Sequence, residues 1–434
     1  MSSKKPVLAV IGSGWGGFTL TQKASLSKYD IKVISPVRTI QYTPLLASAA
    51  CGLFNFRLAE EPVRRKHRAD LQYFKAAAES IDFDARVIRC RAAADTTADG
   101  ATFAAAAAAE KQRPETFDVA YDKLCIAPGC AVQDFGTPGA KQHALFLRTT
   151  DDARRIQQRV LEMLDRASLP TATEAEQRDV LNIRIVGGGA IGIEAAAELW
   201  DLWYEDLRFL VPHLDGKMTI TIHDVAPTIL STFDARLGEY ATSSLRGKDV
   251  QIKTGSHIQR VEADAIHTKE DGRLPFGLLI WATGNKASPL VEQLDVKKPE
   301  KGLPRILTDK YLRVLRPDGS PMEDVYALGD AADIDGESLP TLAEVALQKG
   351  EYLTDVLNSD SEDVQHFHYK QRSLLAYLGR HDGVIGGRQD WTGVSAWLAW
   401  RSGSLGWTRS WRRKISIAIS WAFIWLGGRD IARY

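Results

Sequence analysis

Two glycine-rich turns, each directly after an apolar strand, constrain this chain of 434 residues more than any other feature. The first lies in residues 7–17 and carries Gly12, Gly14 and Gly17 in the spacing G-x-G-x-x-G. In this spacing the first glycine permits a tight bend, the second lets the backbone approach a pyrophosphate, and the third allows close helix packing. The helix expected over residues 18–26 presents free N–H groups and the positive end of its dipole to the anion. The stretch predicts a phosphate-binding turn in an α/β fold.

A second turn of the same construction follows in the middle of the chain. The apolar residues 183–186 lead into Gly187, Gly189 and Gly192, and an alanine-rich helix is expected over residues 193–203. The sequence therefore predicts two nucleotide-binding units of the Rossmann type.

The strands that follow the two turns end differently. Residues 218–223 end in Asp224, and a carboxylate there binds two ribose hydroxyls and repels a 2′-phosphate. Because its spacing from the turn exceeds the usual ~20 residues, a solvated aspartate at a strand end is the alternative. The Asp224 carboxylate therefore favours NADH over NADPH at the second turn. The strand after the first turn differs, because residues 31–35 end in Ser35. Either Ser35 and Arg38 hold the nucleotide differently, or the first site is not for NAD.

Two further strands end in turns that suit a ligand. One comprises residues 278–284, and the other, residues 325–332, contains Gly329 and Asp330. Gly329 lets the backbone close on a ligand, and Asp330 can accept hydrogen bonds from ribityl-type hydroxyls. A Gly-Asp pair alone is a common turn, so it indicates a ligand site only in combination with the two glycine turns.

Glu194 lies on the first turn of the second predicted helix, two residues after Gly192. The helix dipole favours a carboxylate at this position, so a plain helix-start acid is one interpretation. A role near the reacting rings is the other, because the turn must point at the bound dinucleotide.

Charge and cysteine content narrow the class of protein. The chain has 55 basic and 55 acidic residues, so no global field favours nucleic acid. The four cysteines have no metal-ligand spacing, which is typical of an intracellular protein with free thiols and no metal site. Cys125 and Cys130 are five apart and suggest a redox disulfide, but the pair lies at a strand end far from the first glycine turn, so we expect no catalytic role.

Several segments have no chemistry of their own. Residues 36–46 are expected to form a loop that Pro36 and Pro44 hold out of helix and strand. Residues 92–110 suggest a surface hairpin or helix, the polar residues 170–179 suggest a boundary, and the helix expected over 151–167 suggests a bridge between two units. No targeting segment is visible before the first strand, although a cleaved one could be missing.

The C-terminal part has an interfacial composition. Seven of the eleven tryptophans lie in residues 391–434, and residues 391–429 contain six cations and no acid. The apolar run 415–426 is broken only by Ser416 and Ser420, and it is too short to span a bilayer. Amphipathic helices rich in tryptophan and cations lie in the headgroup plane. The alternative, a dimerisation or core helix, would bury the tryptophans but leave the cations without an assigned partner.

Together these residues resemble the two-dinucleotide-binding flavoprotein superfamily. Within it, further motifs resemble type II NADH:quinone oxidoreductases, the alternative NADH dehydrogenases, particularly fungal ones. These motifs are Ser35-Pro36, residues 42–48 (YTPLLAS), 135–139 (FGTPG), 281–284 (WATG) and 343–348 (AEVALQ). The resemblance covers nearly the whole chain, and the last motif is the most specific.

The resemblance implies roles for individual residues. Glu194 matches the family's carboxylate near nicotinamide and flavin, and Glu344 and Gln348 lie on a helix that borders the flavin and the quinone. The family usually has Gln where this chain has Glu344, so a plain helix-surface glutamate is the alternative. FAD contacts are expected at Gly12, Ser13, Gly14, Trp15, Gly16, Gly17, Ser35, Arg38, Thr43, Gly129, Gly329 and Asp330, and NADH contacts at Gly187, Gly189, Ile191, Gly192, Asp224, Thr283 and Gly284.

The resemblance also implies an architecture and an activity. Two Rossmann-like domains are expected, for FAD in residues 1–150 and 285–355 and for NADH in 151–284. Residues 356–434 would dock on the membrane and contribute to a homodimer. The implied enzyme is a peripheral protein, expected at the mitochondrial inner membrane, which oxidises NADH and passes two electrons through FAD to a membrane quinone without pumping protons.

Two rival functions stay open at this stage. One is a soluble NAD(P)H-dependent flavin reductase or ferredoxin-type reductase, for which the basic, tryptophan-rich tail would be unexpected. The other is a signalling flavoprotein that resembles relatives of apoptosis-inducing factor, in which NADH binding changes partners. Binding to liposomes would distinguish the quinone-reducing enzyme from the first rival, and turnover with quinone would distinguish it from the second.

Overall fold

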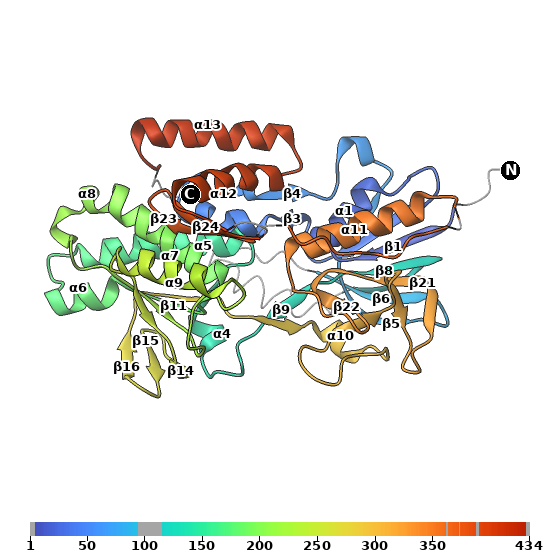
Figure 1. Cartoon of the computed structure of the whole chain (residues 1–434), viewed down its shortest axis with the longest axis horizontal. Helices are drawn as coiled ribbons and strands as arrows, with labels where there is room; N and C mark the ends of the chain where they lie inside the picture. The colour runs from blue at the N-terminus through green and yellow to red at the C-terminus, as the bar shows by residue number, and fades with distance from the viewer. Residues whose placement is uncertain (1–4, 94–114, 362, 373, 388–389, 431–434) are drawn as a thin grey trace. The chain divides into compact units, whose positions relative to one another are not determined.

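The computed structural model describes residues 5–93, 115–361, 363–372, 374–387 and 390–430. The chain forms two compact units. The first unit comprises residues 1–41, 61–131 and 285–370, and the second comprises residues 42–60, 132–284 and 371–434. Each unit contains a parallel sheet in which the strand before a glycine turn has a parallel neighbour on both sides (Figure 1).

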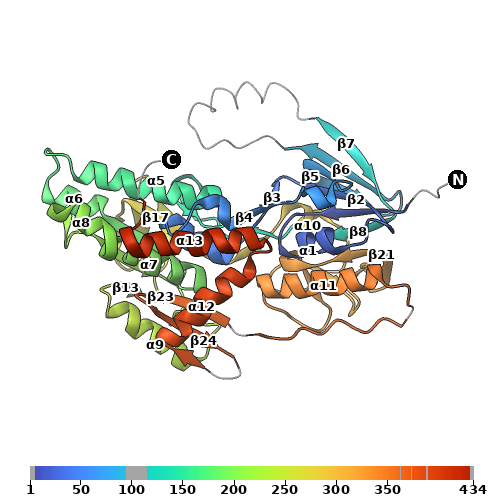
Figure 2. The same cartoon turned by 90° about the horizontal axis from the view of Figure 1, so that it is seen from above.

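The first unit is built on one sheet in the order β22-β19-β20-β21-β8-β1-β2-β5-β6-β7. Its centre, from β21 to β5, is parallel, and Val10 of β1 lies between Val33 of β2 and Cys125 of β8. Leu8, Ala9 and Val10 are fully buried, which is why β1 is apolar at every position rather than alternating. Helices α1 and α11 pack against each other beside this sheet (Figures 1 and 2).

The main elements of the first unit have the following bounds: β1 (Val7–Ile11), α1 (Trp15–Lys23), β2 (Asp30–Ser35), β3 (Thr39–Gln41), β5 (Gln72–Asp82), β6 (Val87–Ala92), β7 (Thr116–Ala120), β8 (Lys123–Ile126), α10 (Pro289–Gln293), β19 (Ile306–Thr308), β20 (Arg313–Leu315), β21 (Pro321–Ala327), the 3₁₀ turn η6 (Gly329–Ala331), β22 (Ala332–Ile334) and α11 (Ala343–Asn358).

The second unit has a parallel sheet in the order β10-β17-β11-β12-β13, an antiparallel sheet β14-β15-β16 and a C-terminal antiparallel sheet β23-β24-β25. Its strands β11 and β12 pair in register from Asn182 with Thr219 to Val186 with His223. The C-terminal hairpin packs on α7 through β23, and α12 covers β23 and β24 (Figure 1). No helix within the described residues combines the length and the apolarity that crossing a membrane requires.

The elements of the second unit are the 3₁₀ turns η1 (Thr43–Leu45) and η2 (Phe56–Ala59), α2 (Leu46–Ala50), α4 (Ala140–His143), β10 (Leu145–Phe146), α5 (Thr150–Ala167), α6 (Glu174–Val180), β11 (Asn182–Val186), α7 (Ala190–Leu202), the π-helical turn η4 (Trp203–Leu207), α8 (Arg208–Leu210), β12 (Thr219–His223), α9 (Ala235–Arg246), β13 (Gln251–Lys253), β14 (Ile258–Val261), β15 (Ala265–Thr268), β16 (Gly272–Pro275), β17 (Leu278–Trp281), β23 (Leu374–Gly379), β24 (Asp382–Gly386), β25 (Trp391–Thr392), α12 (Val394–Trp407) and α13 (Trp411–Gly427).

The structure corrects three expectations about segments. Pro44 does not hold its neighbours out of helix, because it lies in the first turn of η1, where a missing N–H costs nothing, and α2 follows directly. Residues 170–179 are no boundary, since a capping box of Thr173 and Glu176 starts α6 within the second unit. Helix α5 likewise lies inside the second unit and does not bridge two units.

The compact units also group the chain differently from the expected domain limits. Residues 42–60 and 132–150 fall in the second unit, because α2 packs against α5 and α7. Residues 356–370 fall in the first unit, while residues 371–434 fall in the second. The expected insertion at residues 92–110 lies, from residue 94 on, outside the described residues.

Candidate functional site

The three glycines of the first turn have two different environments. A Cβ on Gly12, whose φ is +100°, would lie 2.0 Å from the Ala127 carbonyl oxygen, and one on Gly17 would lie 2.2 Å from the Gly12 carbonyl oxygen. No heavy atom of the described residues comes within 4 Å of a Cβ placed on Gly14, which caps α1. The outer glycines are therefore required by packing, and the middle one faces open space where the N-terminus of α1 can receive a phosphate.

The second turn repeats this geometry in its own unit. A Cβ on Gly187, whose φ is +114°, would lie 2.5 Å from the Ala282 carbonyl oxygen, and one on Gly192 would lie 2.0 Å from the Gly187 carbonyl oxygen. Gly189 caps α7 and again has no heavy atom of the described chain within 4 Å of the added Cβ. Both turns therefore fit a pyrophosphate group, so the residues present suit two dinucleotides.

Ser13 and Ser35 come together at the end of β2. Their hydroxyl oxygens lie 2.9 Å apart, and the Ser13 hydroxyl is also 2.8 Å from the Val37 carbonyl oxygen. Both serines are buried, whereas the Arg38 side chain is exposed nearby. The first turn thus has a neutral hydroxyl pair where a ribose-binding carboxylate is expected for NAD.

Trp15 and Gly16 face the interior of the first unit. Trp15 is 9% exposed, and a Cβ on Gly16 would meet the Leu328 side chain at 2.1 Å and the Ala346 carbonyl oxygen at 3.0 Å. Across this contact, a Cβ on Gly350 of α11 would lie 2.8 Å from the Gly16 carbonyl oxygen. The sequence proposed Gly16 as a cofactor contact, but the close approach of α1 and α11 already accounts for a glycine there.

Asp224 lies beside the second turn, as its position after β12 predicts. Its Oδ2 accepts a hydrogen bond of 2.5 Å from the Gly188 N–H, and its Oδ1 accepts one of 2.8 Å from the Ala226 N–H. Ile191, on the first turn of α7, is 45% exposed. The carboxylate is therefore held at the mouth of the turn by backbone donors.

In each unit the strand next to the glycine turn ends against it. Ala127, whose carbonyl oxygen lies against Gly12, directly follows β8, and Gly129 comes two residues later with a φ of +70° and open space around it. Thr283 and Gly284 follow β17, and both contact the backbone of Gln133. Thr43, expected at the FAD site, is an exposed residue of η1 in the second unit.

The cysteines need a correction. Cys125 is far from the first turn in sequence but not in space, because β8 pairs directly with β1. Its thiol is fully buried, which raises its pKa, and the Cys130 thiol donates to the Asp330 carbonyl oxygen at 3.2 Å. Both are free cysteines, so the structure contains no disulfide between them.

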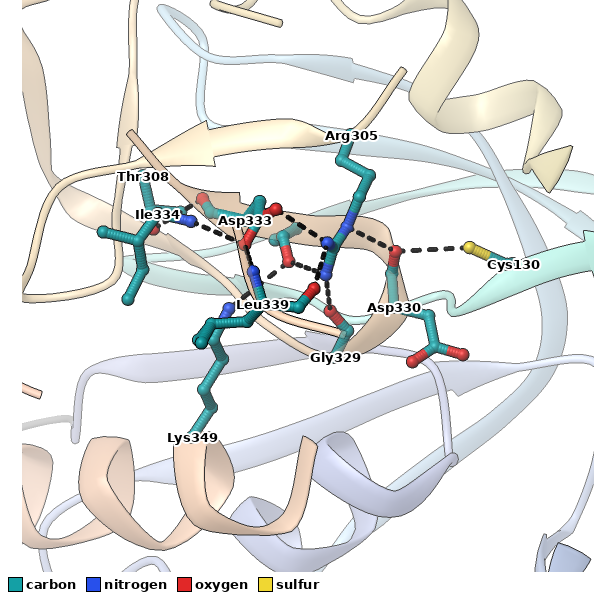
Figure 3. A network of polar contacts seen from close by, with 10 residues as sticks. Cys130, Arg305, Thr308, Gly329, Asp330, Asp333, Ile334, Leu339 and Lys349 are labelled. Atoms are coloured by element: carbon teal, nitrogen blue, oxygen red, sulfur yellow. Dashed lines mark hydrogen bonds and ion pairs between the residues drawn. The ribbon is translucent and has the colours of Figure 1, made fainter. Parts of the chain in front are cut away.

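The Gly329-Asp330 turn rests on a buried arginine (Figure 3). Arg305 donates to the carbonyl oxygens of Asp330, Ala332 and Leu339 at 3.1, 2.6 and 2.8 Å, and pairs with Asp333 at 2.8 Å. The guanidinium binds the backbone of the turn, and Figure 3 shows the Asp330 carboxylate pointing away from the guanidinium. The fully buried Lys349 of α11 donates to the Ala332 carbonyl oxygen at 3.3 Å. Sequence reasoning missed Arg305, since a lone arginine before a short strand is no motif.

Glu344 and Gln348 come together on α11 as their spacing predicts. The Gln348 amide nitrogen donates to the Glu344 carboxylate at 2.6 Å and to the Lys370 carbonyl oxygen at 2.9 Å. The Lys370 N–H in turn donates to the Gln348 amide oxygen at 3.0 Å. Gln348 therefore binds the backbone at Lys370, the last residue of the first unit, in addition to any role toward a ligand.

Glu194 lies under the C-terminal hairpin and α12. The expectation that it lies on the first turn of its helix is wrong, because α7 begins at Ala190 and its first turn contains no acid. Its Oε1 accepts hydrogen bonds from the Trp400 indole N–H at 3.0 Å and the Tyr377 N–H at 3.4 Å. Burial raises the pKa of its carboxyl to about 8, against the lowering effect of these two donors. At neutral pH this group holds a proton on most molecules, a property that a plain helix-start acid does not have.

The outer face of α13 is apolar. Figure 2 looks onto this helix, and no other described element of the second unit covers it. Arg412 and Lys414 lie on its first turn, and Ile417 faces inward and is fully buried. Exposed fractions of 50 to 85% are found for Trp411, Ile415, Ile419, Phe423, Trp425 and Leu426.

Comparison with known proteins gives consistent matches. A family model described as pyridine nucleotide-disulphide oxidoreductase matches residues 6–350. The chain is 34% identical to internal alternative NAD(P)H-ubiquinone oxidoreductase A1, mitochondrial, of Solanum tuberosum, over all of this chain and 89% of that protein. It is 29% identical to the external alternative NADH-ubiquinone oxidoreductase, mitochondrial, of Yarrowia lipolytica, over 99% of this chain and 81% of that protein.

Among solved structures, NDH2 from Plasmodium falciparum in complex with NADH has a similar fold. The TM-score is 0.88 at 21% sequence identity, over 99% of this chain and all of that chain. The sulfide:quinone oxidoreductase of Aquifex aeolicus matches less closely, with a TM-score of 0.66 at 14% identity, over 98% of this chain and 96% of that chain. The α/β fold with Rossmann-type sheets is thus confirmed.

Proposed function

The chain belongs to the pyridine nucleotide-disulphide oxidoreductase family, and we propose that it is an FAD-dependent enzyme that oxidises NADH and reduces a ubiquinone-like quinone. The observation that carries this proposal is the pair of glycine turns, each with a packed outer pair and an open middle glycine. Relatives over the full length of the chain are named NAD(P)H-ubiquinone and NADH-ubiquinone oxidoreductases. When bound, FAD supplies the ring system that accepts hydride and passes on electrons.

We assign FAD to the first unit and NADH to the second. At the first turn Ser35 occupies the position of the ribose-binding carboxylate, which argues against NAD there. The Asp330 carboxylate can accept hydrogen bonds from ribityl hydroxyls, and Arg305 binds the backbone of its turn. Asp224 supplies the ribose-binding carboxylate at the second turn and disfavours a 2′-phosphate. The proposed NADH contacts are Gly187, Gly189, Ile191, Gly192, Asp224, Thr283 and Gly284.

The test is steady-state oxidation of NADH and NADPH by the FAD-loaded protein with a short-chain ubiquinone. We expect quinone-dependent turnover that is at least about tenfold faster in kcat/KM with NADH, because the carboxylate repels the 2′-phosphate. Flavin reduction by NADH without any quinone turnover would overturn the proposal and favour a signalling flavoprotein.

We place quinone reduction beside α11, where Gln348 and Glu344 share a hydrogen bond. Gln348→Ala should impair quinone reduction and leave flavin reduction by NADH intact. Glu344→Gln keeps the size of the side chain and serves as the matched variant for loss of charge. Loss of flavin reduction in Gln348→Ala would show that the tether to Lys370 matters more than the quinone, and would contradict this assignment.

We further propose that residues 391–434 dock the protein on a lipid surface and that this surface is the mitochondrial inner membrane. Relatives that match nearly the whole chain are named mitochondrial, which supports the compartment. The exposed apolar face of α13, with cations on its first turn, has the composition of a helix that lies in the headgroup plane. Substitution of Trp411, Phe423 and Trp425 by Ser should abolish co-sedimentation with anionic liposomes. Phe209→Ser, on exposed α8, is the control.

A second copy of the chain is the competing occupant of the exposed apolar face of α13. A variant that keeps liposome binding but changes from dimer to monomer in light scattering would assign α13 to a second copy of the chain. We expect the opposite, since cations next to exposed tryptophans suit anionic headgroups better than an identical cationic helix.

A further inference from the structure

Hydrogen bonds within the second unit fix the backbone on both sides of Asp224. The His223 carbonyl oxygen accepts from the Gly187 N–H at 2.8 Å, which ties the end of β12 to the second glycine turn. The Asp224 N–H donates to the Lys253 carbonyl oxygen at 2.9 Å, and the Ser256 N–H donates to the Asp224 carbonyl oxygen at 2.9 Å. Asp224 therefore leaves the sheet at a fixed point between the glycine turn and the loop after β13.

A buried row of polar side chains crosses the parallel sheet at this point. It consists of Arg184 of β11, His223 of β12 and Ser256 of the loop after β13, and we call it the polar row. Val186 pairs with His223 in the sheet, and side chains two positions apart in a strand share a face, so Arg184 and His223 point to the same side. All three members of the polar row are buried. Buried polar groups lower stability unless they are paired, so their atoms need partners.

The guanidinium of Arg184 decides which nitrogen of His223 carries the proton. Arg184 Nη1 lies 3.1 Å from His223 Nε2, and a guanidinium can only donate, so Nε2 must be the acceptor. The proton of the neutral ring then lies on Nδ1, which is 2.9 Å from Ser256 Oγ and donates to this hydroxyl oxygen. Burial, together with the positive charge of Arg184, lowers the pKa of His223 to about 4. His223 is therefore a neutral ring in one defined tautomer at neutral pH.

The hydrogen bond from His223 to Ser256 closes a ring around the Asp224 peptide. The Ser256 hydroxyl accepts from the imidazole, while the Ser256 N–H donates to the Asp224 carbonyl oxygen. Arg184 anchors this ring to the antiparallel sheet, since its Nε donates to the Pro275 carbonyl oxygen at 2.8 Å. A rotation of the Asp224 peptide that moves the carboxylate away from the glycine turn must break at least one of these bonds.

The surroundings of the polar row are apolar. Val186, the partner of His223 in the sheet, belongs to a buried cluster with Leu279 and Trp281. In place of His223, an apolar residue would pack in this layer without the cost of burying an imidazole. The hydrogen bonds of the polar row instead converge on the strand end that carries Asp224, which packing alone does not require.

We propose that His223 and Ser256 are positioning residues: the hydrogen bond between them holds the Asp224 carboxylate where it binds the ribose hydroxyls of NADH and repels the 2′-phosphate of NADPH. This inference rests on the proposed function, in which the second unit binds NADH. Because both side chains are buried, they act through Asp224. Loss of their hydrogen bond should weaken recognition of the adenosine half of NADH and leave hydride transfer at the nicotinamide unchanged.

Two variants of His223 form a matched pair. The amide of Gln reaches the position of Nε2, so His223→Gln keeps an acceptor for Arg184 and loses the donor to Ser256. The amide of Asn reaches the position of Nδ1, so His223→Asn keeps the donor to Ser256 and loses the acceptor for Arg184. Ser256→Ala removes the proposed hydrogen bond from its other side. Ser243→Ala, at an exposed position of α9, is the control.

Two measurements on the full-length, FAD-loaded protein separate binding from hydride transfer. Isothermal titration with ADP-ribose gives the affinity for the part of NADH that lacks the nicotinamide. Anaerobic stopped-flow gives the limiting rate of flavin reduction and its dependence on the concentration of NADH or NADPH. We expect ADP-ribose to bind about fivefold more weakly to Ser256→Ala and His223→Gln, as for one lost hydrogen bond, and within twofold of wild type to His223→Asn. The limiting rate should stay within twofold of wild type, and the preference for NADH over NADPH should fall by about fivefold in the first two variants.

Several outcomes would overturn the positioning role. Wild-type affinity for ADP-ribose in Ser256→Ala and His223→Gln refutes it. Equal losses in His223→Gln and His223→Asn would show that the polar row only stabilises the unit, which also refutes it. If the His223 variants do not fold, Ser256→Ala decides alone, because it removes a single hydroxyl. A wild-type protein that binds neither ADP-ribose nor NADH refutes the proposed function itself, whereas binding by wild type with unchanged variants refutes the positioning role alone.

Discussion

Replacing Gly14 or Gly17 with alanine should separate the binding of FAD from the stability of the first unit. A Cβ on Gly14 meets no described atom within 4 Å, and the φ of −71° at this residue suits alanine. Alanine is a poorer helix cap than glycine by up to about 1 kcal/mol, but it lowers the entropy of the unfolded chain by a similar amount. The unfolding free energy of Gly14→Ala without FAD should thus stay within about 1 kcal/mol of wild type.

Gly17→Ala should behave differently, because the added Cβ would lie 2.2 Å from the Gly12 carbonyl oxygen. That oxygen belongs to the backbone, so the helix must move away from the turn by about 1 Å, and overpacking of this kind costs about 3 kcal/mol at the upper end of its range. The better helix propensity of alanine offsets about 1 kcal/mol. The net loss of about 2 kcal/mol corresponds to a fall in melting temperature of about 4–8 °C for a unit of about 200 residues.

Two measurements distinguish the variants. Thermal unfolding of the FAD-free proteins, followed by circular dichroism, should show a lower melting temperature only in Gly17→Ala. Titration with FAD, followed by flavin fluorescence, should show affinity lower by at least about tenfold, or about 1.4 kcal/mol, in both. Binding of FAD to Gly14→Ala with wild-type affinity would refute the placement of the pyrophosphate at this turn.

Three further predictions concern single side chains. Arg305→Met leaves Asp333 as an uncompensated buried charge, so it should lower the unfolding free energy by about 3–5 kcal/mol and cause loss of flavin absorbance. Arg316→Met, at an exposed position, is the control and should do neither. Equal stability of the two variants would contradict the proposed role of Arg305. Asp224→Ala should reduce the preference for NADH over NADPH by about tenfold in kcat/KM, and an unchanged ratio would limit Asp224 to holding the turn. The folded-state pKa of Glu194, about 8, lies above its unfolded value of about 4.3, so the contribution of this one carboxyl to stability should be complete below pH ~4.3 and be lost as the pH rises toward 8. The difference in unfolding free energy between wild type and Glu194→Gln, measured in urea titrations, should therefore change with pH over this range, and a constant difference would argue against a buried neutral carboxyl.

Local signals in the sequence were sufficient for the elements that carry the dinucleotides. An apolar run before G-x-G-x-x-G predicts a buried strand and a turn, and both turns have that structure, with a positive φ at Gly12 and Gly187. The spacing of four between Glu344 and Gln348 puts both on one face of their helix, and in the structure the Gln348 amide donates to the Glu344 carboxylate. In each case the geometry depends on residues within a few positions of one another, so it can be read from the chain.

Contacts between residues distant in sequence could not be predicted in this way. The pairing of β8 with β1 places Cys125 beside the first turn, although the two are over a hundred residues apart. Arg305 reaches the Gly329-Asp330 turn only because β19 pairs with β22. Glu194 was visible in the sequence, but its burial required β23 and α12 to fold back on α7.

The sequence by itself determined two glycine turns of the dinucleotide-binding type, an aspartate at the end of the strand after the second of them, and a basic, tryptophan-rich C-terminal segment. Only the tertiary structure decided that Glu194 is a buried, proton-holding carboxyl under Trp400 and that Arg305 fixes the Asp330 turn. The physical reason is that backbone turns and helix faces follow from neighbouring residues, whereas burial and hydrogen bonding depend on which distant segments come to lie on top of them.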